Sequence, residues 1–208
     1  MLLEFITIFI LSICVLLILF FKTKEAPFFQ PHNETDNEKI INSLKKISLL
    51  NWPSEMHKIE KNRSQNREYW TLMCLILSKI FRNAKNDHLT IILGLGSNFL
   101  STILIYFVFT NFFDSKIGFL SSFIYLSCFW SYHACLFIGH VVLSQMFFLI
   151  SILFLQMTSF LNHEISLIMF FLSGIFTVIS FFSSSSSLKY PPLIVIAVVY
   201  YIKKDISF

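Results

Sequence analysis

The chain has 208 residues, of which 55% are hydrophobic, 17% aromatic and only 13% charged, and its formal net charge is +4. A soluble domain of this size would lack the polar side chains that cover a water-exposed surface. The composition therefore excludes an ordinary water-soluble protein and predicts an all-α, multi-pass transmembrane helical bundle. The expected location is the plasma (inner) membrane or the endoplasmic reticulum.

A helix needs about 20 apolar residues to cross a hydrocarbon core of about 30 Å. Stretches of this kind predict about six spans: Leu2–Phe21, Leu89–Phe113, Ile117–Leu136, Val141–Leu161, Ile165–Phe182 and Pro191–Ile202. The first is predicted to be a retained anchor, because Glu4 is its only early charge and it lacks the basic start of a cleaved signal peptide. The last has only twelve residues before Lys203, so it predicts a clipped or half-inserted span.

The chain divides into a first span (1–21), a polar segment (22–88) and a hydrophobic bundle (89–208). The polar segment holds twelve of the sixteen Lys and Arg residues and eight of the twelve acidic residues. Apolar residues recur at helical spacing in two parts of it, from about Asp36 to Leu50 and from Arg67 to Arg82. We therefore expect two amphipathic juxtamembrane helices in this first long loop.

Two acidic residues of the polar segment, Asp36 and Glu38, follow the first span closely enough to remain near the membrane surface. A carboxylate there could act as a general base toward an acceptor hydroxyl or stabilise a developing positive sugar centre. The same residues also suit the first turn of a helix, where acids are favourable. Both interpretations stay open.

Three further side chains could bind a substrate. His133 and His140 are seven residues apart, which would place them on one face of a continuous helix. Lys189 lies between two apolar stretches, where a cation needs an anionic partner such as a lipid phosphate or must extend to the interface. Interfacial histidines and an extended lysine are the alternatives. No metal site or cofactor is expected, because no Asp, Glu or Cys pattern completes a ligand set.

Four stretches carry a resemblance to a known family: LSTILIYF at 100–107, FFDSKIGFL at 112–120, HVVLSQMFF at 140–148 and SLKYPP at 187–192. Together with a first span, an early acid in the following loop and juxtamembrane helices, this succession resembles the N-terminal portion of the GT-C membrane glycosyltransferases. Protein mannosyltransferases and aminoarabinose transferases belong to that superfamily.

The resemblance implies transfer of a sugar from a polyprenyl-phosphate donor to an acceptor at the outer or lumenal face of the membrane. It implies Asp36 as the catalytic residue, with Glu38 beside it, and Lys189 as the contact for the donor phosphate, while His133 and His140 are candidates for substrate binding. Besides the lipid bilayer, a partner subunit could complete the fold, and no nucleic-acid partner is expected.

A non-catalytic membrane protein, either an assembly subunit or a carrier, is the alternative from another functional class. The resemblance places residues 22–88 outside the cytoplasm, whereas an excess of Lys and Arg favours cytoplasmic loops. In this alternative the basic loop is cytoplasmic and binds a partner or anionic lipid.

Overall fold

The computed structural model describes residues 2–25, 68–81, 86–128 and 139–183. Within these ranges the chain forms helices and no strand. The helices are α1 (Leu2–Glu25), α4 (Glu68–Ile80), α5 (Asn86–Phe112), α6 (Ser115–Ser127), α8 (Gly139–Met157) and α9 (His163–Ser183). The predicted helix from Asp36 to Leu50 and the predicted span Pro191–Ile202 lie outside the described residues.

Among the described helices, four are long and apolar enough to cross a membrane, over Leu2–Phe21, Ile91–Phe112, His140–Met157 and His163–Ser183. The predictions of an all-helical fold and of a membrane protein are confirmed at this level. About half of the residues of the second and third of these spans are buried, but only 11% of those of the first and last. α5 and α8 therefore form the centre of the bundle, and α1 and α9 lie at its edges.

The third predicted span is wrong as one continuous helix from Ile117 to Leu136. α6 begins after Asp114, whose carboxylate accepts hydrogen bonds from the amides of Lys116 and Ile117 at 2.8 and 2.9 Å. It ends at Ser127, because Cys128 has an extended backbone and its amide bonds to the carbonyl of Tyr125. α6 has 13 residues and is about 20 Å long, which is shorter than a hydrocarbon core. Residues 129–136 of the predicted span lie outside the described residues.

The fourth predicted span, Val141–Leu161, ends earlier than expected. Its helix, α8, stops at Met157, and the amides of the next three residues bond to carbonyls only three residues back. The hydroxyls of Thr158 and Ser159 also donate to the carbonyls of Leu155 and Gln156, at 2.6 and 2.8 Å. Because these bonds satisfy the last carbonyls of α8 locally, the chain can turn into α9 at His163.

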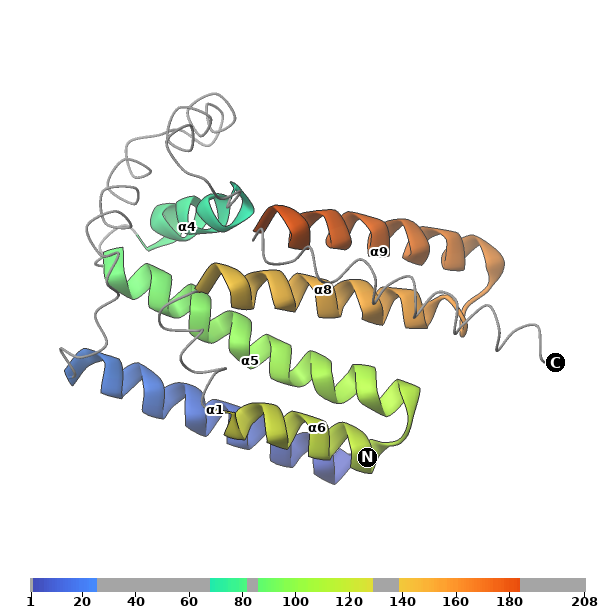
Figure 1. Ribbon diagram of the computed structural model, residues 1–208, viewed down its shortest axis with the longest axis horizontal. Coiled ribbons are helices and arrows are strands. Elements are labelled where there is room, and N and C mark those ends of the chain that lie inside the picture. The colour runs from blue at the N-terminus through green and yellow to red at the C-terminus, as the bar shows by residue number, and fades with distance from the viewer. Residues whose placement is uncertain (1, 26–67, 82–85, 129–138, 184–208) are drawn as a thin grey trace.

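The helices stack in one direction as a series (Figure 1). α1 and α6 contact one side of α5, α8 contacts the other side of α5, and α9 packs on α8. At one end of the bundle α1 and α9 finish, α5 and α8 begin, and α4 is packed; we call this the α4 end. At the other end, the Asp114 end, α1 begins, α5 turns into α6 and α8 turns into α9.

Aromatic rings and a close helix approach join α5 to its neighbours on the α1 side. The rings of Phe5 and Tyr106 lie 5.7 Å apart, and so do those of Phe9 and Phe99. α6 approaches α5 at Gly118, where an added Cβ would collide with the hydroxyl of Thr110 and would lie 2.7 Å from the carbonyl oxygen of Tyr106. A small residue at this position allows the two backbones to come together.

Hydroxyl side chains fix the pairing of α8 with α9. Ser144 and Ser180 each donate to the other's carbonyl, at 2.9 and 2.7 Å. Seven residues further along α8, Ser151 donates to the carbonyl of Ser173 at 2.9 Å and lies 2.7 Å from the hydroxyl of Thr177. After seven more residues, beyond the end of α8, the carbonyl of Thr158 accepts a bond from Ser166 at 3.0 Å.

These three cross-links form what we call the serine seam, defined by Ser144/Ser180, Ser151/Ser173 and Thr158/Ser166. From one cross-link to the next, the first residue is seven positions later in the chain and its partner in α9 is seven positions earlier. A repeat of seven keeps one set of side chains on the contact face of two packed helices. The seam therefore sets both the antiparallel orientation and the register of the α8–α9 hairpin, with small residues that permit close packing.

A fully buried amide side chain joins α5 to α8 near the Asp114 end. Gln156 donates to the carbonyl of Val108 at 2.9 Å and accepts from the side-chain amide of Asn111 at 3.3 Å. A polar group in this apolar environment is costly unless it is paired. The two hydrogen bonds fix α5 and α8 in a parallel arrangement at this level.

Candidate functional site at the α4 end

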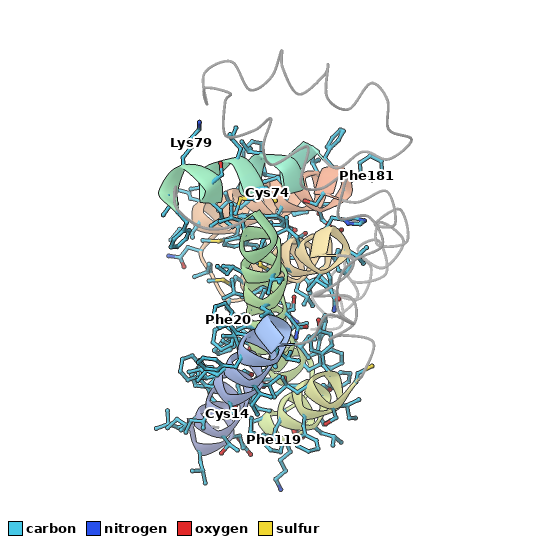
Figure 2. All side chains as sticks on the ribbon, turned by 90° about the vertical axis from the view of Figure 1, so that its left-hand side faces the viewer. Cys14, Phe20, Cys74, Lys79, Phe119 and Phe181 are labelled. Atoms are coloured by element: carbon cyan, nitrogen blue, oxygen red, sulfur yellow. The ribbon has the colours of Figure 1, made fainter. Side chains whose placement is uncertain are left out.

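The polar segment of the chain leaves and re-enters the bundle at the α4 end. α1 finishes there before the segment begins, and α4 and the start of α5 follow it. In Figure 2, which views the bundle from this side, α4 lies across the edge of the bundle that is opposite α1, with Cys74 labelled on it. The described helices that flank the segment with most of the charge are therefore joined to it at one end of the bundle.

One face of α4 is part of the hydrophobic core. Cys74 and Leu75 are fully buried and pack in a cluster with Leu93 of α5 and with Leu143 and Met146 of α8. The prediction of a helix between Arg67 and Arg82 is confirmed by α4, and the buried face of this helix covers the starts of α5 and α8. α4 is thus held at this end by packing against other helices of the bundle.

The thiol of Cys74 has no chemical role in such a site. Burial in the apolar cluster raises the pKa of Cys74 well above its ordinary range. A nucleophilic cysteine needs a lowered pKa and partial exposure. Cys74 is therefore a packing residue.

His140 is the one predicted site residue that lies within the described ranges. It is the second residue of α8, at the α4 end, and only 8% of its surface is exposed. No group of three or more His, Cys, Asp or Glu side chains that could hold a metal ion occurs among the described residues. His140 is thus placed at the same end of the bundle as the polar segment, with no described ligand set around it.

The other predicted site residues, Asp36, Glu38, His133 and Lys189, lie outside the described residues. Along the chain, Lys189 follows the end of α9 by six residues, His133 precedes the start of α8 by six, and Asp36 follows the end of α1 by eleven.

Two polar side chains inside α5 were not singled out from the sequence. The side-chain oxygens of Asn98 and Ser101 are buried without a hydrogen-bond partner within the described part of the chain. Buried polar groups are normally paired, and polar residues inside spans often line functional regions. The signal available in the sequence was the run of small and polar residues from Gly94 to Thr102 within an apolar stretch.

No protein-family model, no curated protein and no solved structure matches this chain.

Proposed function

We propose that this protein is a GT-C-like membrane glycosyltransferase, or the N-terminal part of one, which transfers a sugar from a polyprenyl-phosphate donor to an acceptor at the outer or lumenal membrane face. The proposal retains about six membrane crossings, two more than the four long apolar helices. One observation carries it: α1 and α9 finish, and α8 begins, at the same end of the bundle, the α4 end.

This arrangement supports the proposal because each of those helix ends leads to a candidate residue. α1 leads to Asp36 and Glu38, α9 leads to Lys189, and His140 opens α8. A transferase that uses a lipid-linked donor needs a carboxylate and a phosphate contact at the same membrane surface. Residues attached to opposite ends of the bundle could not meet across about 30 Å of hydrocarbon.

In the proposed mechanism each residue has one role. Asp36 deprotonates or orients the acceptor hydroxyl, and Glu38 supports it. Lys189 binds the donor phosphate, whose negative charge also offsets the cost of a cation near the apolar phase. His133 and His140 hold the substrate, and the basic residues Lys45 and Lys46 favour anionic head groups.

We expect Asp36→Asn to lower sugar transfer from a polyprenyl-phosphate donor by about 10²- to 10⁴-fold, the usual contribution of a general base. The substitution preserves size and removes the proton acceptor. The measurement is the transfer of radiolabelled sugar in membranes that contain equal amounts of the variant and of the unmodified protein. Glu60→Gln removes another acid of the same segment and is the matched control, with transfer unchanged. Full activity of Asp36→Asn would eliminate the assigned role.

The charge distribution favours a second candidate, a non-catalytic carrier or assembly subunit. Twelve of the sixteen basic residues lie in the segment 22–88, and cytoplasmic loops normally carry the excess of Lys and Arg. In this candidate the α4 end is cytoplasmic and the segment binds anionic lipid or a partner.

The sidedness of the α4 end separates the two candidates. Single cysteines at Asp36 and Glu60, in a chain without its native cysteines, are treated with a membrane-impermeant maleimide before and after lysis. The transferase proposal predicts labelling in intact cells, or in sealed lumen-out vesicles for an endoplasmic reticulum protein. Labelling only after the membrane is opened would favour the carrier or assembly subunit.

A further inference from the structure

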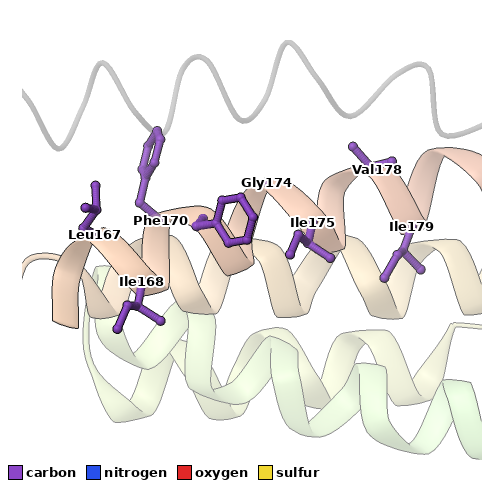
Figure 3. A pocket seen from close by; sticks show the side chains of 8 residues that line it. Leu167, Ile168, Phe170, Gly174, Ile175, Val178 and Ile179 are labelled. Atoms are coloured by element: carbon purple, nitrogen blue, oxygen red, sulfur yellow. The ribbon is translucent and has the colours of Figure 1, made fainter. Parts of the chain in front are cut away.

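The outer face of α9, away from α8, carries an apolar groove of about 820 Å³ (Figure 3). Its lining contains one glycine and otherwise only Leu, Ile, Val and Phe side chains. Four of the lining residues recur at spacings of four, three and four along the helix: Leu167, Phe171, Gly174 and Val178. We call these four residues the outer seam.

The outer seam has the pattern of a helix-packing surface. Apolar residues that alternate at spacings of three and four form the contact line of two packed helices. The three large members are 67%, 68% and 50% exposed, in chain order. A Cβ added to Gly174 would meet no atom within 4 Å, so the centre of the seam has room for a side chain from another helix.

α9 therefore has one face in contact with α8 and a second face with the pattern of a packing surface. The serine seam is already occupied by α8, through Ser173 and Ser180. The outer seam has no cover among the described residues. A glycine in a helix is unfavourable relative to alanine, but in a membrane it allows a second helix to approach closely.

We propose that residues 191–202 of this same chain pack along the outer seam as an antiparallel segment. α9 ends at Ser183, and 25 residues follow it, of which 191–202 are all apolar apart from two tyrosines and two prolines. The link from 184 to 190 has seven residues. Connections of two to eight residues join adjacent antiparallel helices in bundles.

The sequence of the segment matches the seam in size. In an antiparallel pair, Ala197 faces Gly174, so that the two smallest residues meet. Leu193 then faces Val178, and Tyr200 faces Phe171. The segment repeats the seam's spacing of four and three, from 193 to 197 to 200. The returning segment brings Lys203 and Lys204 toward the Asp114 end, where α1 begins.

Disulfide trapping tests this packing in the full chain. Gly174→Cys and Ala197→Cys are combined in a chain in which Cys14, Cys74, Cys128 and Cys135 are replaced by alanine, with a protease site inserted after Ser186. Membranes are oxidised, cleaved and analysed without reductant. We expect the two fragments to stay joined until a thiol is added, because facing residues of packed helices allow the Cβ separation of about 4 Å that a disulfide needs.

The control places the second cysteine in the same segment but on the opposite face of the helix. Gly174→Cys with Val195→Cys places the second thiol two residues away, on the other side of a helix, so the fragments should separate. A second pair, Phe171→Cys with Tyr200→Cys, tests the same register with different residues, in case one pair disturbs folding. Failure of both facing pairs would overturn the proposal.

Two other occupants give distinct results. If a second copy of the chain covers the groove, Gly174→Cys alone will form covalent dimers, and the facing pairs will link chains instead of fragments. If lipid covers it, oxidation will produce neither product. Either result overturns the proposal, and neither depends on sugar transfer, so this inference and the proposed function can fail separately.

Discussion

Replacing Ser151 by leucine is expected to destabilise the bundle by about 3 kcal/mol. Ser151 is fully buried, and its hydroxyl bonds across to the backbone of Ser173. Forcing extra carbon atoms into such a contact typically costs about 1–3 kcal/mol. The lost hydrogen bonds between helices add about 0.6–1.7 kcal/mol. The measurement is unfolding in mixed micelles on titration with sodium dodecyl sulfate, followed by circular dichroism.

Two companion variants separate bulk from hydrogen bonding. Ser151→Ala removes the bonds without adding volume, and we expect a loss of about 1 kcal/mol. Ser127→Leu adds the same side chain at an exposed position of α6, where only a bond to the carbonyl of Phe123 is lost, so little change is expected. Equal stability of Ser151→Leu and Ser127→Leu would show that the serine seam does not hold α8 and α9 together.

Gly118→Ala is expected to have the second large effect. The single added methyl group should lower the free energy of unfolding by about 1–3 kcal/mol. The hydroxyl of Thr110 could rotate away from the new Cβ, but the carbonyl oxygen of Tyr106, at 2.7 Å, belongs to the backbone of α5. α6 would have to move away from α5. The change should appear in the same unfolding titration, and as closer access of lipid-soluble quenchers to Tyr106, which is almost fully buried.

Gly96→Ala provides the matched control for this substitution. Gly96 is also inside a helix, but an added Cβ there meets nothing within 4 Å. Alanine is favoured over glycine in helices by up to about 1 kcal/mol, so this variant should be as stable as the original protein or slightly more stable. A similar loss at both positions would mean that helix packing at Gly118 is not the cause.

The sequence predicted most of what depends on local hydrophobicity. Apolar length alone located α1, α5, α8 and α9, because the bilayer requires long apolar helices. Hydropathy did not predict the helix ends that polar side chains set. The hydroxyls of Thr158 and Ser159 capture the last carbonyls of α8, and such local bonds are not visible in a hydropathy pattern.

The contacts between helices could not be predicted from one sequence. Two serines of α8, 144 and 151, are seven residues apart, and so are two serines of α9, 173 and 180. Their pairing can be recognised only once the two helices are known to pack against each other. The same holds for Gln156, whose partners belong to α5, about 45 residues earlier. For the candidate site, the structure locates His140 at the α4 end, and the roles of Asp36, Glu38, His133 and Lys189 stay predictions.

The serine seam has a consequence for how the chain enters a membrane. Its hydroxyls are satisfied within the hairpin of α8 and α9, without any contribution from α5. Two helices that neutralise each other's polar groups can move from a translocation channel into lipid together, as one preformed unit. Gln156 is different, since it bonds to α5 and can be satisfied only when the hairpin docks. The hairpin is thus suited to insert first as a pair and to find its place beside α5 afterwards.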